Sequence, residues 1–183
     1  FDSQEYTCHY MRIRSDNNFD PDEVSDSNPR VRPETITEEW ALEEIKRACL
    51  RDMKDSFYTN SETHMEALHD VSAGTKGNAL LIFNGAGFMI GKINLHYDDT
   101  SLTVNVMQLY VFGDRRRMIG RMTTEKQFIN GPYIIWYFVA LIAAEMYGDC
   151  ARILISHPRD TILNLILKVG GRFVELKGND HRT

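Results

Sequence analysis

Residues 79–112 read ALLIFNGAGFMIGKINLHYDDTSLTVNVMQLYVF, and this stretch decides the fold. Three apolar runs, at residues 79–83, 88–97 and 102–112, are separated by the turns Asn-Gly-Ala-Gly and Asp-Asp-Thr. Residues of these types favour tight reversals, so that consecutive strands run in opposite directions. The stretch therefore predicts a three-stranded antiparallel meander.

The part before the meander predicts a strand followed by helices. Residues 6–15 end in an alternation of apolar and charged side chains, which is typical of a strand with one face in water. A helix is predicted over residues 37–54, where apolar residues recur at helical spacing after a capping box formed by Thr35 and Glu38. A second, weaker helical pattern covers residues 61–71.

The part after the meander predicts a long loop, a helix and then shorter elements. Residues 113–130 hold five basic and two acidic residues and indicate a loop or an exposed hairpin. Pro132 is expected to open an apolar helix over residues 133–147, because the first helical position needs no amide donor. That helix is apolar all round, which predicts burial on most sides. A buried strand, a short helix and a final strand follow, at residues 151–155, 160–169 and 172–176.

The order of these elements predicts an α/β fold, with a mixed, mostly antiparallel sheet and helices on both faces. The chain has 183 residues, a length that usually folds as one unit. We therefore expect a single domain over residues 1–183. Residues 16–34, which are acidic and contain three prolines, are expected to form a loop within it.

Composition excludes several classes of function. A net charge of −5 argues against sequence-independent DNA binding, which depends on a surplus of Lys and Arg. The longest apolar run, residues 134–144, is too short to cross a bilayer, and the first residues lack a signal-peptide pattern. We therefore expect a cytoplasmic protein without a membrane partner. The three cysteines have neither paired nor metal-binding spacing, so we expect free, buried thiols.

Common catalytic and metal-binding motifs are also missing. The sequence has no nucleophile elbow, Walker loop or dinucleotide fingerprint. Residues 16–27 begin like a calcium-binding loop, but Pro21 and Ser27 stand where Gly and Glu are needed. His64 and His69 are five apart and do not share a helix face as zinc ligands do. No metal site is expected.

Three stretches resemble the GNAT superfamily of N-acetyltransferases. ALLIFNGAGFMIGKINL, with Gly91 in the middle of its second strand, is similar to the family's second and third strands. VMQLYVFGDRRRMIG resembles the fourth strand and its exit into the phosphate loop. ILISHPRDTILNLILKVGGRFVE resembles the fifth strand, the following helix and the Gly-Phe-type ending. The resemblance covers residues 78–176, and the earlier elements agree with it in order. It implies a GNAT-like fold.

The resemblance also implies an activity, a cofactor and site residues. The activity is transfer of an acyl group from acetyl-CoA, or another acyl-CoA, to an amine acceptor. A gap between the fourth and fifth strands beyond Tyr110 would admit the pantetheine arm, and loop amides at a helix start would hold the pyrophosphate. The implied catalytic residues are Tyr110, His157 and Gln108. The implied cofactor-binding residues are Val111, Arg116, Arg117, Gly120, Gln127, Asn130 and Gly131. His96 and Tyr97 end the third strand and could face the acceptor groove or simply be part of the strand's surface.

The cluster Arg115, Arg116 and Arg117, with Arg121, is the densest charge feature of the chain. Guanidinium groups match phosphate geometry, so the cluster could clamp the phosphates of CoA. Two alternatives are contact with an acidic partner or nucleic acid, and a solvated hairpin tip.

A second function stays open beside catalysis. Met122 stands where the family's phosphate loop has Gly or Ala, Pro132 removes an amide donor, and Ile166 stands where the family often has Tyr. These substitutions favour a GNAT-shaped protein that has lost catalysis and serves as a binding or structural component, of the viral kind that occurs among tailed phages.

Overall fold

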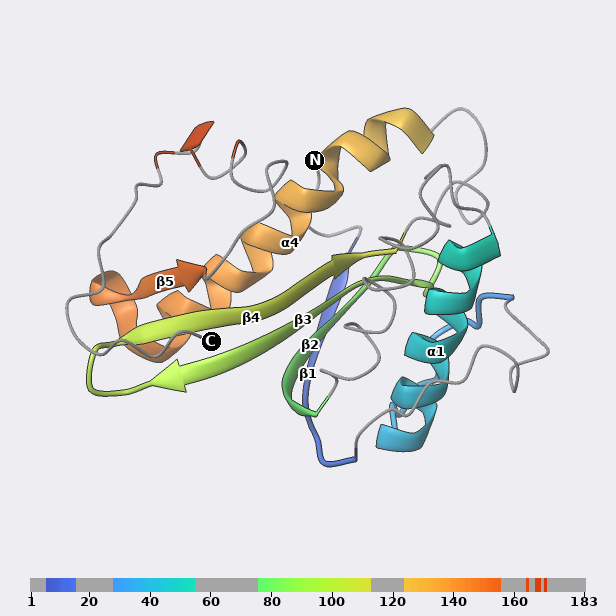
Figure 1. Ribbon diagram of the computed structural model, residues 1–183, viewed down its shortest axis with the longest axis horizontal. Coiled ribbons are helices and arrows are strands. Elements are labelled where there is room, and N and C mark those ends of the chain that lie inside the picture. Colours follow the sequence, from blue (N-terminus) through green and yellow to red (C-terminus); the bar gives the residue numbers. More distant parts are fainter. Residues whose placement is uncertain are drawn as a thin grey trace.

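The computed structural model of this chain describes residues 6–15, 28–54, 76–112 and 124–155, and the single positions 164, 167, 168 and 170. A five-stranded sheet with the strand order β1-β2-β3-β4-β5 forms its centre (Figure 1). The elements are β1 (Thr7–Ile13), α1 (Glu38–Lys54), β2 (Gly77–Phe83), β3 (Met89–Asp98), β4 (Thr103–Val111), α4 (Thr124–Tyr147), a short 3-10 turn (Gly148–Cys150) and β5 (Arg152–Ile155).

The sheet is mixed and mostly antiparallel, as predicted. Strands β1 to β4 pair antiparallel with their neighbours in chain order, which confirms the meander. Strand β5 returns parallel to β4. A parallel neighbour needs a long crossover, and helix α4 lies in the connection between the two strands. The predicted final strand at residues 172–176 lies outside the described residues.

The core lies on both faces of the sheet. Successive residues of β2 point to opposite faces, and all of residues 79–83 are fully buried. Leu80 and Ile82 belong to the cluster that packs under α4. Leu81 and Phe83 belong to the cluster that packs under α1. Because one strand feeds both clusters, the two helices cover opposite faces, as the sequence predicts (Figure 1).

Helix α1 begins with a different cap from the one expected. The Oγ1 atom of Thr37, not of Thr35, accepts the backbone N–H of Trp40 at 3.1 Å. The Glu38 carboxylate accepts the backbone N–H groups of Arg14 and Ser15 at 2.8 and 2.9 Å. These bonds hold the pKa of Glu38 below its ordinary value. Glu38 therefore ties the helix start to the end of β1 instead of closing a capping box.

Helix α4 starts earlier than predicted and is less buried. It begins at Thr124, so Pro132 lies inside it and does not open it. A proline within a helix removes one hydrogen bond, and the rest of this 24-residue helix remains. Ile135 and Val139 pack on the sheet, whereas Leu141 on the outer side is 47% exposed. The prediction that α4 is buried on most sides is therefore wrong.

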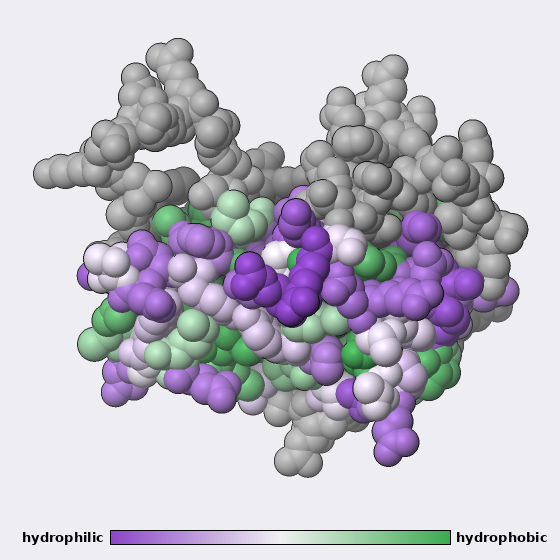
Figure 2. All heavy atoms as spheres, turned by 90° about the horizontal axis from the view of Figure 1, so that it is seen from below, coloured by the Kyte–Doolittle hydropathy of each residue, from purple (hydrophilic) through white to green (hydrophobic). Residues whose placement is uncertain are grey.

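Further apolar side chains lie near the end of α4. Met146 and Ile153 are exposed. Apolar residues gather on the left of Figure 2, the end at which β5 and the last turns of α4 lie in Figure 1. Among the helices that are described, none is long and apolar enough to cross a membrane.

Several predicted features can be compared only in part. The weak helix at 61–71, most of the 16–34 loop and the segment 113–123 lie outside the described residues. In the predicted short helix, Asn164, Leu167 and Lys168 are helical. Gly170 has a φ of 92° and donates its N–H to the Leu167 carbonyl, which fits a glycine at a helix end. The three cysteines are free, but Cys150 is exposed instead of buried.

Candidate functional site

A β-bulge interrupts β4 at Met107. Asn94 of β3 pairs with Gln108, but the next residue, Leu95, pairs with Val106. Met107 is therefore an extra residue on β4, and its side chain is 64% exposed. A bulge bends its strand and increases the local twist, and bulges are frequent beside active sites.

The pairing of β4 with β5 ends at the same point. Thr103 to Val106 pair with Arg152 to Ile155, whereas β4 continues along β3 as far as Val111. Within the described part of the chain, β5 offers no partner to residues 107–111. The expected gap beyond Tyr110 would involve the residues that follow Ile155, which lie outside the described part of the chain, so the gap stays a prediction. A strand edge of this kind carries backbone N–H and C=O groups that an extended ligand can bind.

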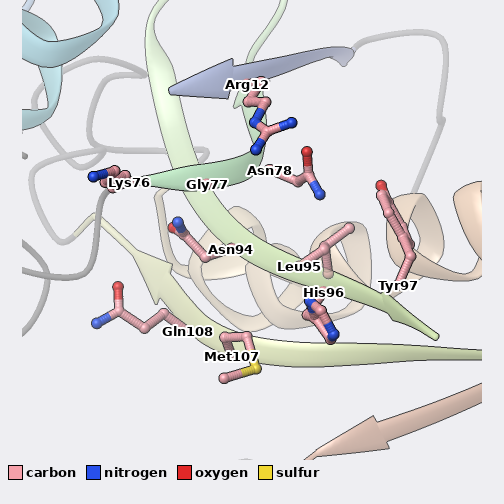
Figure 3. Close-up of a pocket in the computed structure, with 10 residues that line it drawn as sticks. All are labelled: Arg12, Lys76, Gly77, Asn78, Asn94, Leu95, His96, Tyr97, Met107 and Gln108. Carbon is pink, nitrogen blue, oxygen red and sulfur yellow. The ribbon is translucent and has the colours of Figure 1, made fainter. Parts of the chain in front are cut away.

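A pocket of about 700 Å³ opens beside the bulge. This volume lies within the range of roughly 300–1,000 Å³ that is usual for small-molecule sites. Figure 3 shows its walls on the first four strands. The lining residues are Arg12, Lys76, Gly77, Asn78, Asn94, Leu95, His96, Tyr97, Met107 and Gln108.

Strand register places three polar side chains on the α1 face. Asn94 pairs with Ala79, which packs under α1, and also with Gln108. Directly opposed residues share a face, and His96 lies two residues after Asn94 on the same strand. Asn94, His96 and Gln108 therefore point to the face that α1 covers elsewhere.

The pocket extends around the start of β2. Gly77 begins this strand with a φ of 122°, a value that favours glycine, whereas β3 runs on to Asp98. Arg12 pairs with Asn78, two residues before Leu80, and both lie on the α4 face by alternation. They therefore reach the pocket around the short end of β2.

Lys92 lies beneath the pocket. It is 1% exposed, and its Nζ donates to Oε1 of Gln108 at 3.4 Å. Burial lowers the pKa of Lys92 to about 8, and this effect is opposed by nearby Cys49. Lys92 is also the register partner of Tyr110 on β4. A buried amine thus orients a side chain of the pocket wall.

Tyr97 forms a non-ionising part of the wall. Burial, followed by the hydrogen bond with Tyr10, raises the pKa of Tyr97 above its ordinary value. Tyr10 in turn donates its hydroxyl to Oδ1 of Asn78 at 3.0 Å. Because Tyr97 stays protonated at neutral pH, it can shape the pocket or donate a hydrogen bond, but it cannot act as a base.

Of the three predicted catalytic side chains, the structure describes that of Gln108 alone. Gln108 lines the pocket, as do His96 and Tyr97. Tyr110 and Val111 lie on β4 beyond the bulge, where only their backbone is described. His157 lies outside the described residues. The structure thus brings one of the three predicted catalytic side chains to the pocket.

The predicted phosphate loop needs correction. Gln127, Asn130 and Gly131 lie in α4, not in a loop before it. Only the first four amides of a helix lack an internal partner, so Asn130 and Gly131 are too far along to offer amides. Their contact with the cofactor stays a prediction without that loop geometry. The other candidates, Arg115, Arg116, Arg117 and Gly120, lie outside the described residues.

Sequence reasoning missed Arg12, Lys76, Lys92 and Asn94. A signal was present for two of them, because Lys92 and Asn94 alternate with the apolar residues Ile93 and Leu95. Two polar residues at that spacing share one face of a strand. No comparable signal marks Arg12 and Lys76, which come to the pocket through strand pairing.

Strand order, the parallel β4–β5 pair and the bulge together identify the architecture. The fold is GNAT-like. No family model matches the chain, and no curated protein sequence matches it.

Similar solved structures are acetyltransferases of low sequence identity. A provisionally assigned acetyl transferase from Pyrococcus furiosus has a TM-score of 0.40 and 14% identity, with 75% of this chain and 93% of that chain covered. A possible acetyltransferase from Clostridium difficile has a TM-score of 0.42 and 8% identity, with 97% of each covered. An aminoglycoside 6′-N-acetyltransferase from Acinetobacter baumannii has a TM-score of 0.29 and 14% identity, with 94% of this chain and 99% of that chain covered. All three come from cellular organisms and lend no support to a phage origin.

Proposed function

We propose that this protein is an acyl-CoA-dependent N-acyltransferase. The observation that carries the proposal is the bulge in β4 at Met107, which directly follows the four described β4–β5 pairs and lines the pocket. The bulge leaves a strand edge on one side, and the pocket lies beside it. One ligand can therefore lie along the edge while a second occupies the pocket.

The chain's own groups fit the cofactor. The pantetheine arm of CoA contains two amides, which suit the backbone edge of residues 107–111 and the position of Val111 on it. Arg116 and Arg117 follow that strand and are proposed to hold the phosphates. When bound, the thioester supplies an activated acyl carbon, to which the amine nitrogen bonds as the C–S bond breaks and the thiol leaves with the amine's proton.

The pocket residues are proposed to position the acceptor. The Gln108 side chain does not titrate, so its role is to orient the amine beside the edge, with Lys92 holding its Oε1 atom. Tyr110 and His157 remain the proposed groups for the proton transfer, because a phenol and an imidazole can both exchange protons.

A second function is favoured by one feature of the pocket. Among its described lining residues there is no Asp or Glu that could accept the amine's proton. A GNAT-shaped protein that binds CoA or another ligand without turnover would need no such group. The two functions differ in whether acylated product forms, so binding and transfer have to be measured separately.

Binding of the cofactor is tested by thermal unfolding with increasing acetyl-CoA. We expect saturable stabilisation that grows with ligand concentration, as mass action requires. The variant R116A/R117A is expected to weaken binding at least several-fold, or about 1 kcal/mol, because charged phosphate contacts are lost. The matched control R14A/R152A removes two exposed arginines, one just after β1 and one in β5, and is expected to bind normally. Absence of any shift at millimolar acetyl-CoA would overturn the proposal.

A further inference from the structure

The charge of the pocket differs from that of the whole protein. The chain carries 26 acidic and 21 basic residues. The ten described lining residues, by contrast, include Arg12, Lys76 and His96 but no carboxylate. Three amide side chains, those of Asn78, Asn94 and Gln108, complete the polar wall. Such a wall attracts an anionic group and repels a polycation.

The two permanent cations are available to a ligand. Arg12 and Lys76 are exposed, and within the part of the chain that the structure describes neither forms an ion pair. The neighbouring carboxylate of Asp98 is engaged elsewhere. It accepts the hydroxyl of Ser101 at 2.7 Å and the backbone N–H of Thr100 at 3.0 Å. It therefore closes its own turn and does not line the pocket.

The cations lie at the opposite end of the pocket from the bulge. Lys76 precedes β2, and Arg12 pairs with Asn78 near the start of that strand. Gln108 and Met107 lie on β4, two strands from β2 and three strands from Arg12 on β1 (Figure 3). Neighbouring strands are about 4.8 Å apart, so the strands at the two ends are separated by roughly 10–14 Å.

We propose that the acyl acceptor is an amine that carries an anionic group, a carboxylate or a phosphate, several bonds away from its nitrogen. The anionic group binds Arg12 and Lys76, and the amine reaches Gln108 beside the bulge. This inference rests on the proposed transferase function and names its class of acceptor. It excludes polyamines, whose charge the pocket does not complement.

The test measures acceptor binding by calorimetry without any acyl-CoA. The probes are ω-aminohexanoate, its carboxamide, an aminopentyl phosphate, the diamine cadaverine and glycine. We expect the carboxylate or the phosphate to bind about tenfold more tightly than the carboxamide and cadaverine, and more tightly than glycine, which is too short. If the carboxylate and phosphate probes differ in affinity, the tighter of the two identifies the anionic group of the acceptor.

Matched variants locate the contact. R12Q/K76Q is expected to lose about three- to tenfold in affinity for the anionic probe, a range set by the exposure of both side chains. R14Q/R152Q removes two exposed cations outside the pocket and is expected to leave affinity unchanged. The inference is wrong if the carboxamide or cadaverine binds as tightly as the anionic probes, or if both double variants lose the same affinity for the anionic probe. It is also wrong if no probe binds at millimolar concentration. Because acyl-CoA is absent, such a failure leaves the binding of acetyl-CoA unaffected and separately testable.

Discussion

Replacing Lys92 by Met is expected to stabilise the protein at pH 7, and this advantage is expected to shrink by about 2–3 kcal/mol between pH 7 and pH 10. Burial lowers the pKa of Lys92 from 10.5 to about 8. In the unfolded chain the amine keeps its proton up to about pH 10.5. Between these two values the unfolded state binds more protons than the folded state, so the stability of the parent protein rises with pH relative to K92M.

Chemical denaturation of both proteins at pH 7, 8.5 and 10 measures this difference. K76M is the control, because it makes the same substitution at an exposed lysine. If the difference in unfolding free energy between K92M and the parent protein is the same at all three pH values, the Lys92 amine is not desolvated in the folded protein. The result matters for the site because Lys92 holds Gln108.

Replacing Arg30 by Met is expected to destabilise the protein by about 2–3 kcal/mol. Glu44 on α1 is fully buried, and its Oε2 accepts from Nε of Arg30 at 3.3 Å. The Arg30 guanidinium also lies 5.6 Å from the ring centre of Trp40. Without the guanidinium, the buried negative charge of Glu44 loses the positive charge that stabilises it. The Arg30 side chain is 36% exposed, which limits the loss below that of a fully buried pair.

A double-mutant cycle separates this coupling from lost packing. R30M/E44L is expected to recover most of the stability lost in R30M, because the buried charge is removed together with its partner. Urea unfolding of the four proteins gives the coupling energy. If the two single changes simply add, the ion pair does not anchor residues 28–32 to α1, and other packing holds that segment in place.

The sequence predicted the elements with strong local signals. The meander follows from two turns and three apolar runs, and α1 follows from helical spacing after a polar start. The start of α4 was missed because Pro132 is favourable at a first helical position, and nothing local shows that a helix continues through it. The cap was placed at Thr35 because Thr35 and Glu38 match the capping box, although Thr37 makes the bond.

The candidate site was harder to predict, because it depends on register. Met107 has no feature that marks a bulge, since the extra residue is defined only by its partners on β3. Arg12, Lys76 and Gln108 line one pocket only because strands β1 to β4 pair with one another. The resemblance to GNAT proteins supplied Gln108, whereas the positive wall of the pocket could be recognised only after the strands were paired.

The measurement that tests the central claim most directly is hydrogen exchange of individual backbone amides, followed by NMR with and without acetyl-CoA. The account predicts slower exchange, in the presence of the cofactor, for amides of residues 107–111 that face away from β3. Amides of residues 103–106, which β5 already pairs, are expected to change little. Binding of acetyl-CoA that leaves residues 107–111 exchanging as before would contradict the assignment of this edge as the cofactor site.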